Sequence, residues 1–559
     1  MVRVRAVDHS NGRQIMWCRF PGTVVSRLAV ASLAAITICL AVPVPAMAVF
    51  DKASSRAERA LRDGDYAQAE QIYREMLSKN AHNNDARLGL SLALLKQRNI
   101  QDAYDHAARV LATDPLSARA HALLGSAILA AGGFRESVEE FRTALSLNED
   151  EAMAIAGLAM IDFYENRSGP ALRGLQRAAA LVPNEPDYVF NLGQAAARTE
   201  RYKEAADAYE RFLAIAPKTD ADRRARIRGL IDFLRYLGQQ KSLYELAGAG
   251  RTIVPFDASD NRPILMVRVN GEKTPLRFVL DTGSGMSVIS QTTAKRLGLH
   301  PVAQGGLARA VGGPGRFEIV YGFLESLTIG DVEVNNVPVY IRPFYDTKTP
   351  VDGYLGVSVI SKFVTSIDYG ELSFTLSRQR STGNPDPWGA VRSSDSRSTT
   401  ESLGAGTEIE IPLRTTSSGF LSGEVRLDGV DQFWNFIIDT GASVSVVAEQ
   451  LAALEGISNY PKADTMRVYG AAGISENVKT LILPRVMLGT LSQEKINAAV
   501  LDLDPVNETA GFRQSGILGA NFLKHFRVTF DFQRGVLRLE PLSTRAKGAD
   551  VPKPDQVYQ

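Results

Sequence analysis

One stretch of this 559-residue chain occurs twice, and this duplication constrains the fold more than any other feature. Each copy has an Asp-Thr-Gly triplet directly after a short apolar run, at positions 281–283 and 439–441. Each copy later has a Gly-x-Leu-Gly segment, at positions 353–356 and 516–519. We therefore expect two copies of one domain, the second with about five extra residues between these elements.

Each triplet follows a predicted β-hairpin, with strands at 264–269 and 276–280 in the first copy and at 419–427 and 433–438 in the second. An aspartate after a buried strand places a carboxylate at the strand end, where the glycine allows a sharp turn. Two facing carboxylates can hold and activate a water molecule. Asp281 and Asp439 are therefore candidate catalytic residues. The alternative is a pair of buried, hydrogen-bonded aspartates in a non-catalytic β domain.

The order of Asp-Thr-Gly, glycine-rich loop and apolar-Leu-Gly resembles the retropepsin-like lobe of viral and bacterial aspartic peptidases. The resemblance implies two all-β retropepsin-like lobes, residues 251–378 and 407–545, that form a pseudo-two-fold acid-protease unit. It implies that Asp281 and Asp439 meet between the lobes and share one proton. No cofactor and no metal ion is then required for peptide hydrolysis.

The resemblance also assigns supporting roles in the active-site loops. Thr282 and Thr440 are expected to cross-link the triplets by hydrogen bonds, and Gly283 and Gly441 to bring backbone N–H groups near the carboxylates. The copies differ at the next two positions, which are Ser284 and Gly285 in the first and Ala442 and Ser443 in the second. The Ser284 hydroxyl can hydrogen-bond a carboxylate, so we expect unequal environments for the two aspartates.

A glycine-rich segment follows each catalytic aspartate at the same distance along the chain, at positions 311–315 and 469–473. We expect hairpin tips that close over an extended peptide and exclude water; ordinary turns are the alternative. Tyr469 either hydrogen-bonds the substrate or packs on its strand. Asp368 and Asp531, which also correspond between the copies, are expected to be surface hairpin residues without a chemical role. The candidate flap residues are Gly312, Gly313, Tyr469 and Gly470.

Residues 51–250 repeat with a period of 34. Small residues recur at this spacing, as expected where paired helices approach closely. The pattern resembles the tetratricopeptide repeat in five copies, and an amphipathic helix at about 224–246 is expected to close the stack. Such stacks commonly hold a protein partner on their concave face. One series of small residues is Ala57, Ser91, Gly125, Ala159 and Gly193, and a second is Ala69, Ala103, Ser137, Ala171 and Ala205.

Residues 1–48 have the pattern of an export signal, with arginines before an apolar stretch at 28–42 and the cleavage motif Ala46-Met47-Ala48. We expect a periplasmic or secreted protein without a transmembrane domain in the mature chain; an uncleaved anchor is the alternative. Both cysteines, Cys18 and Cys39, lie in this segment. Disulfides, Cys-ligated metals and Cys nucleophiles are therefore excluded from the mature protein.

The net charge of +1 argues against a nucleic-acid partner, which would require a basic domain or stripe.

Residues 379–406 are rich in Ser, Thr, Gly and Pro and indicate a flexible linker, and the polar tail 546–559 is expected to be disordered. A linker of about 28 residues spans roughly 30 Å, enough for the lobes of one chain to pair. The repeats and lobes are expected to have separate cores.

The sequence thus predicts an exported aspartic endopeptidase that cleaves a protein or peptide substrate, with helical repeats that recruit the substrate or a partner. One alternative is a non-catalytic envelope scaffold with protease-like lobes. Another is an enzyme that is active only when lobes of different chains pair.

Overall fold

The computed structural model describes residues 5–8, 13–16, 52–313, 315–346, 348–378 and 408–542. The chain divides into a first compact unit (1–154, 216–219 and 450–459) and a second one (155–215, 220–449 and 460–559). The predicted linker and tail lie outside the described residues. Of the predicted export signal, only β1 (Arg5–Asp8) and β2 (Arg13–Met16) are described, as an antiparallel pair.

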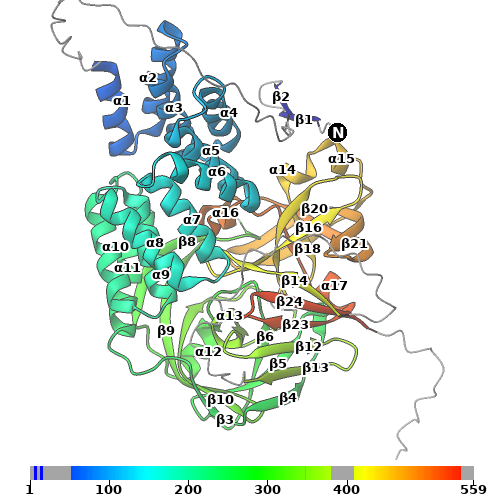
Figure 1. Cartoon of the computed structure of the whole chain (residues 1–559). Helices are drawn as coiled ribbons and strands as arrows, with labels where there is room; N and C mark the ends of the chain where they lie inside the picture. Colours follow the sequence, from blue (N-terminus) through cyan, green and yellow to red (C-terminus); the bar gives the residue numbers. More distant parts are fainter. Residues whose placement is uncertain are drawn as a thin grey trace, which may run out of the picture. The chain divides into compact units, whose positions relative to one another are not determined.

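Residues 52–237 form eleven helices, of which the first ten are five antiparallel pairs (Figure 1). The second helices begin at residues 66, 100, 134, 168 and 202, so the predicted period of 34 is confirmed. The helices are α1 (Lys52–Asp63), α2 (Tyr66–Lys79), α3 (Asn84–Lys96), α4 (Ile100–Leu111), α5 (Ala118–Ala131), α6 (Phe134–Leu147), α7 (Ala152–Tyr164), α8 (Ser168–Leu181), α9 (Pro186–Arg198), α10 (Tyr202–Ile215) and α11 (Ala221–Leu237).

The close approach of paired helices explains why small residues recur every 34 positions. A Cβ added to Gly125 on α5 would lie 2.9 Å from the ring of Phe141 on α6. One added to Gly193 on α9 would lie 3.0 Å from the ring of Tyr209 on α10. A larger side chain would therefore push the paired helices apart.

The closing helix α11 is shorter than predicted, because it ends at Leu237 and Gly238 caps it. The expectation of a helix to residue 246 is wrong. The chain instead forms β3 (Glu245–Gly248), which pairs with residues 332–335 in the sheet of the first lobe. Backbone hydrogen bonds to that sheet replace those that a longer helix would make.

Each lobe contains an eight-stranded sheet. The first has the order β3, β10 (Val332–Arg342), β7 (Val288–Ser290), β11 (Gly353–Leu355), β6 (Leu276–Leu280), β5 (Ile264–Val269), β9 (Arg316–Ile329) and β8 (Ala303–Arg309). The second has the order β15 (Arg414–Thr415), β16 (Leu421–Leu427), β17 (Phe433–Ile438), β22 (Gly516–Leu518), β18 (Ser445–Ala448), β21 (Leu491–Leu501), β20 (Gly473–Leu488) and β19 (Lys462–Gly470).

The registers show that the two lobes are copies of one fold. Strand β11 runs parallel to β6 with Leu355 opposite Leu280, and β22 runs parallel to β17 with Leu518 opposite Ile438. Both predicted hairpins, β5–β6 and β16–β17, are confirmed. The short helices of the lobes are η1 (Ser259–Asn261), α12 (Gln291–Arg296), α13 (Val357–Ile360), α14 (Glu449–Ala452), α15 (Glu455–Ser458), α16 (Asp504–Ala510) and α17 (Ala520–Leu523).

Most of the extra length of the second copy lies just before its Gly-x-Leu-Gly segment. In the first lobe, β10 ends at Arg342 and β11 begins at Gly353. In the second lobe, the connection from the end of β21 at Leu501 to the start of β22 at Gly516 is longer. The second lobe contains α16 in this connection, so the added residues form a helix there.

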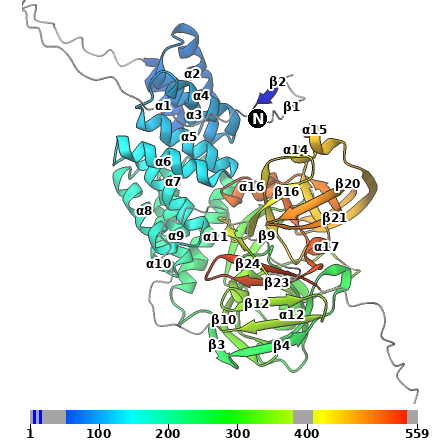
Figure 2. The ribbon, with the colours of Figure 1, turned by 45° about the vertical axis from the view of Figure 1, so that its right-hand side comes forward.

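A six-stranded sheet takes three strands from each lobe (Figure 2). At its centre β12 (Val364–Asp368) and β23 (Phe526–Asp531) are antiparallel, and the hydroxyls of Ser366 and Thr529 lie 2.9 Å apart. The strands in order are β14 (Ile409–Pro412), β24 (Val536–Pro541), β23 (Phe526–Asp531), β12 (Val364–Asp368), β13 (Ser373–Ser377) and β4 (Arg251–Pro255).

Two aspartates of this sheet were expected at the surface, and this expectation is wrong. Asp368 is 7% exposed and Asp531 is 4% exposed. Asp368 pairs with Arg527 of the other lobe at 2.6 Å, and Asp531 pairs with Arg538 at 3.2 Å. Both aspartates do begin hairpin turns, where Asp368 accepts from the Gly370 N–H at 2.9 Å and Asp531 from the Arg534 N–H at 3.2 Å, but their side chains are buried.

The expectation of separate cores for repeats and lobes is also wrong. In the second unit, Phe233 of α11 stacks on Tyr321 of β9 with ring centroids 4.1 Å apart. Leu237 and Leu243 belong to the same buried cluster. Arg226 on α11 donates to the Leu307 carbonyl of β8 at 2.9 Å. The apolar face of the closing helix is therefore covered by the first lobe.

The second lobe contacts the repeats as well. The rings of Tyr164 on α7 and Phe512 lie 5.0 Å apart, and Arg198 on α9 donates to the Thr416 carbonyl at 2.9 Å. The guanidinium of Arg198 lies 3.6 Å from the centre of the Phe163 ring.

Within the described ranges, no helix combines the length and the apolar sequence that a membrane span needs.

Candidate active site

The two aspartates that the sequence selects lie at equivalent strand ends. Asp281 follows β6, and its backbone N–H donates to the Leu355 carbonyl at 3.0 Å. Asp439 follows β17, and its backbone N–H donates to the Leu518 carbonyl at 3.0 Å. The Gly-x-Leu-Gly segment of each lobe therefore anchors the loop that carries the aspartate.

Thr282 and Thr440 link the two loops reciprocally. The backbone N–H of Thr282 donates to the Thr440 hydroxyl at 3.1 Å, and that of Thr440 donates to the Thr282 hydroxyl at 3.0 Å. Each hydroxyl donates to a carbonyl of the opposite strand at 2.7 Å, Thr282 to Ile438 and Thr440 to Leu280. Both threonines are fully buried, so these four bonds form without competition from water.

Gly283 and Gly441 pass close to the carboxyl group of the opposite lobe. A Cβ on Gly283 would lie 2.3 Å from Asp439 Oδ2, and one on Gly441 would lie 2.6 Å from Asp281 Oδ1. Only a residue without a side chain fits at either place. The two carboxyl groups are thereby brought together between the lobes.

The carboxyl groups of Asp281 and Asp439 hydrogen-bond each other. Burial and then the negative charge of Asp439 raise the pKa of Asp281 well above the ordinary aspartate value. Burial also raises the pKa of Asp439, while the N–H groups of Gly441 and Ala442 and the bond from Asp281 oppose this rise. Both shifts disfavour two negative charges at this place, so one carboxyl of the pair holds a proton.

The sequence suggested that the Ser284 hydroxyl makes the environments of the two carboxyls unequal. The structure shows that it does not. The Ser284 hydroxyl donates to the Met286 carbonyl at 2.7 Å and not to a carboxylate. The difference lies in backbone donors, because Asp439 Oδ1 accepts from Gly441 at 2.8 Å and from Ala442 at 3.1 Å. Asp281 Oδ1 accepts from Gly283 at 3.0 Å. Additional N–H donors favour the ionised form of Asp439.

Two buried serines support the site and were missed from the sequence. The Ser287 hydroxyl accepts from the Gly356 N–H at 3.0 Å, and the Ser445 hydroxyl accepts from the Gly519 N–H at 3.0 Å. Both serines are fully buried. Their separation along the chain equals that of the two triplets, and this equality was the available signal.

Arg342, at the end of β10, is a further residue near the dyad that the sequence did not single out. Its charge acts on Asp281 and opposes the effect of burial on the pKa of that carboxyl. Burial in turn lowers the pKa of Arg342 itself. Nothing in the triplet pattern marks this position, because Arg342 comes from a different strand.

The candidate flaps are hairpin tips, β8–β9 in the first lobe and β19–β20 in the second, and the two tips meet. A Cβ on Gly312 would lie 2.8 Å from Gly470 Cα, and one on Gly313 would lie 2.7 Å from the Gly473 nitrogen. Tyr469 lies beside Arg467 of its own strand, which interacts with its side chain. The structure thus brings together Gly312, Gly313 and Gly470.

Ser443, the remaining candidate, lies beside the dyad loop of the second lobe. Its carbonyl accepts a hydrogen bond from the Asn261 side chain at 3.5 Å. Its position thus connects this loop to η1 of the first lobe.

Two ion pairs lie beside the tip of the first flap, where Arg309 and Arg316 are opposite each other. Arg309, at the end of β8, pairs with Glu508 of α16 at 2.9 Å, and Arg316, at the start of β9, pairs with Asp222 of α11. The first flap is therefore connected both to the second lobe and to the repeats. A Cβ on Gly229 of α11 would lie 2.0 Å from the Gln304 carbonyl of β8, so the helix lies directly on this strand.

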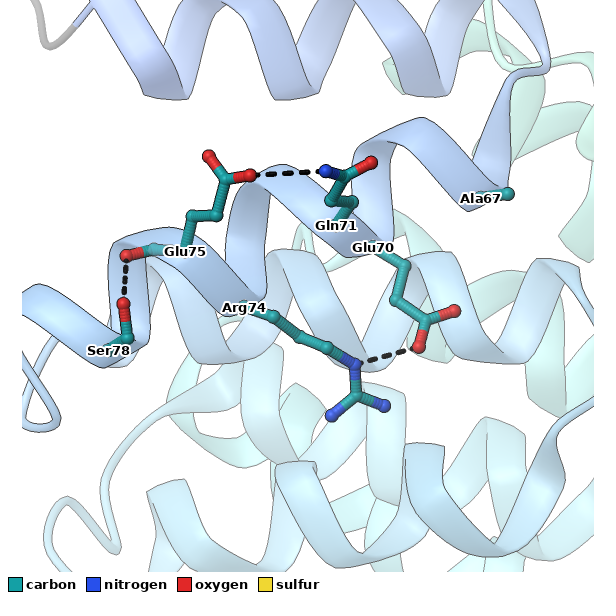
Figure 3. A pocket seen from close by; sticks show the side chains of 6 residues that line it. All are labelled: Ala67, Glu70, Gln71, Arg74, Glu75 and Ser78. Atoms are coloured by element: carbon teal, nitrogen blue, oxygen red, sulfur yellow. Dashed lines mark hydrogen bonds and ion pairs between the residues drawn. The ribbon is translucent and has the colours of Figure 1, made fainter.

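A hollow on α2 carries no comparable chemistry (Figure 3). Its polar groups already pair with each other: Arg74 with Glu70 at 2.8 Å, and Gln71 with Glu75 at 3.2 Å. In the described part of the chain, no three His, Cys, Asp or Glu side chains gather as a metal site would require. The residues that line the hollow are Ala67, Glu70, Gln71, Arg74, Glu75 and Ser78.

The raised pKa of Asp281 predicts an unusual dependence of stability on pH. A carboxyl with a raised pKa in the folded state contributes fully to stability below its unfolded pKa of about 3.9. This contribution is lost as pH rises through the folded-state pKa. We expect Asp281→Asn to raise the melting temperature at pH 7 by a few degrees, and the gain to shrink toward pH 4. Thermal melts from pH 4 to pH 8 measure this; a wild-type protein that melts higher at pH 7 would contradict the prediction.

Comparison with known families places two kinds of sequence along the chain. A family model described as aspartyl protease matches residues 265–359 and 423–522. Two models described as tetratricopeptide repeat match residues 60–127 and 157–219. The aspartyl protease segments contain both Asp-Thr-Gly triplets and both Gly-x-Leu-Gly segments.

Individual proteins resemble part of this chain. Anaphase-promoting complex subunit 3 of Schizosaccharomyces pombe is 27% identical over 157 residues, which are 28% of this chain and 24% of that protein. The chain therefore spans about a quarter of the length of this curated relative. A thermophilic TPR protein of Thermus thermophilus is 20% identical with a TM-score of 0.28, over 32% of this chain and 97% of that one. MamA of Desulfovibrio magneticus RS-1 is 19% identical with a TM-score of 0.22, over 29% and 92%.

Proposed function

We propose that this chain, in which tetratricopeptide repeats precede a two-part retropepsin-like aspartyl protease region, is an aspartic endopeptidase. Its substrate is a protein or peptide, and a water molecule held between Asp281 and Asp439 attacks the scissile carbonyl. The proposal rests on one observation above the others: two separate lobes bring one carboxyl group each to a single place, where they share a hydrogen bond.

The unequal numbers of N–H donors to the two carboxyls assign their roles. Asp439, whose ionised form accepts several N–H donors, takes a proton from the attacking water. Asp281, which accepts from fewer N–H donors, hydrogen-bonds the carbonyl oxygen of the substrate and gives it a proton as the tetrahedral diol forms. When the C–N bond breaks, the proton on Asp439 passes to the leaving nitrogen. Asp281 recovers a proton from the diol, so the pair returns to its starting state without a covalent intermediate.

The surroundings of the dyad suit this reaction. The reciprocal threonine bonds fix the distance between the loops, so little reorganisation is needed at the moment of reaction. Two meeting flap tips can enclose an extended peptide and exclude water from the reacting bond. The flaps must separate for a peptide to enter.

The repeats and the N-terminal segment 1–48 add two finer proposals. Tetratricopeptide repeats are protein-interaction modules, so we assign them the recruitment of a protein substrate or partner. The apolar stretch at 28–42 and the Ala-x-Ala motif support export of the chain, with the mature protein in the periplasm or secreted.

The test is incubation of the purified protein with a denatured protein substrate between pH 3 and pH 8, followed by mass spectrometry of the products. We expect internal cleavage that falls on the alkaline side, when the shared proton is lost, and on the acid side, when both carboxyls are protonated. Chelators and thiol reagents should leave cleavage unchanged. No cleavage at any pH would favour the non-catalytic scaffold, and a chelator-sensitive activity would contradict the dyad mechanism.

A further inference from the structure

Arg342 is a cation close to the dyad that has no acidic partner among the described residues. It is half-buried at the end of β10, and its guanidinium carbon lies 5.6 Å from the ring centres of both Phe344 and Tyr354. These two rings contact each other edge to face at 4.9 Å. Within the described ranges, no carboxylate lies within salt-bridge distance of the Arg342 guanidinium, and no group accepts a hydrogen bond from this guanidinium.

The strand register brings this cation to the reacting centre. Tyr354 lies on β11 opposite Val279 of β6, two residues before Asp281. The guanidinium and the Asp281 carboxyl interact electrostatically. A peptide whose scissile bond lies at the dyad must therefore place a neighbouring side chain near Arg342.

The second lobe lacks this cation. Arg342 pairs in parallel with Ser290 of β7, and the equivalent pairing in the second lobe joins Leu501 to Ala448 of β18. Ser290 and Ala448 are separated along the chain by the same distance as the two triplets, so Leu501 occupies the position of Arg342. Leu501 is 9% exposed. The dyad thus has a cation on one side and a leucine on the other.

An unpaired, half-buried guanidinium is costly unless something satisfies it. The two rings stabilise its charge from their faces but accept none of its N–H bonds. A carboxylate matches its planar fork with two parallel hydrogen bonds, which a neutral amide of the same shape cannot equal. Asp281 is not this partner, because its carboxyl accepts from the Gly283 N–H and faces Asp439.

We propose that Arg342 is a specificity-determining residue that binds an acidic side chain of the substrate next to the scissile bond. The substrate class is then a protein segment with Glu or Asp on the side of the first lobe and an apolar residue on the side of Leu501. This inference rests on the proposed peptidase function and adds the substrate class to it.

The experiment compares paired peptides that differ only by Glu or Gln, with the substitution moved through each position around a mapped cleavage site. At one position, the wild-type protein should cleave the Glu peptide with a kcat/KM about tenfold or more above that of the Gln peptide. In Arg342→Met this ratio should fall to about one. Arg342→Lys should retain part of the preference, since it keeps the charge without the fork.

Arg268→Met is the matched control, because Arg268 is an exposed arginine on β5 of the same lobe. It removes the same charge and should leave the ratio unchanged. If the Gln peptides are cleaved but no position shows a Glu preference in the wild type, the inference on Arg342 is wrong and the peptidase function stands. A preference that survives in Arg342→Met also overturns the inference. If no peptide is cleaved, the proposed function itself fails.

Discussion

Asp281→Asn and Asp439→Asn should each reduce kcat/KM for a peptide by about 10³-fold or more. Asparagine at 439 cannot take a proton from water, and asparagine at 281 cannot give one to the carbonyl oxygen. The double variant should be little worse than either single variant, because the two carboxyls act as one unit. Steady-state kinetics on one peptide, with circular dichroism to verify folding, provides the measurement.

A complementation test follows from the same variants. Both triplets of one chain meet through the bonds between Thr282 and Thr440. Mixing Asp281→Asn chains with Asp439→Asn chains should therefore restore no activity. Recovered activity that rises with total protein concentration would show that lobes of different chains pair. Full activity in either single variant would instead refute the shared dyad.

We expect a fragment of residues 252–542 to lose peptide cleavage, although it contains both aspartates of the proposed dyad. This fragment lacks β3, which pairs with β10, and α11, which covers Tyr321. It also lacks the helices that contact Phe512 and Thr416 of the second lobe. Without α11, the apolar face of β9 around Tyr321, which forms one side of the first flap, is exposed. A fragment of residues 152–542, which keeps α7–α11, should remain folded and active on short peptides.

A single substitution tests the same interface without removing any chain. Gly229→Ala on α11 places a Cβ 2.0 Å from the Gln304 carbonyl, so we expect a loss of about 1–3 kcal/mol and lower peptide cleavage. Gly169→Ala on α8 is the matched control, since its Cβ would meet only the Arg173 side chain at 3.5 Å. By helix propensity alone, alanine stabilises a helix by up to about 1 kcal/mol. Equal melting temperatures for the two variants would contradict a close contact between α11 and β8.

The parts of the fold that repeat were the predictable parts. The period of 34 located the paired helices, and the two Asp-Thr-Gly triplets located the equivalent hairpins. The family models confirm both resemblances, to tetratricopeptide repeats and to aspartyl proteases. Repetition reveals these elements because a side chain with the same packing role recurs at a fixed distance.

What the sequence did not predict depends on contacts between segments that have no internal copy. Gly229 has a partner on β8 rather than on another repeat, so no period marks it. Arg342 lies in the first lobe only and is Leu501 in the second, so comparing the lobes does not identify a shared role. Ser284 was assigned to the carboxylate by position, yet its hydroxyl is used by Met286 two residues away. Local backbone geometry decided that contact.

The six-stranded sheet has a consequence for how the activity should depend on dilution. Its central strands, β12 and β23, belong to one polypeptide, as do the two halves of the dyad. An enzyme assembled from two identical subunits falls apart as its concentration drops below its dissociation constant. Here the two lobes belong to one chain, so their pairing does not depend on concentration. The turnover number of each molecule should therefore stay constant down to picomolar enzyme. If the proposed function is correct, the chain needs no second copy of itself to complete its dyad.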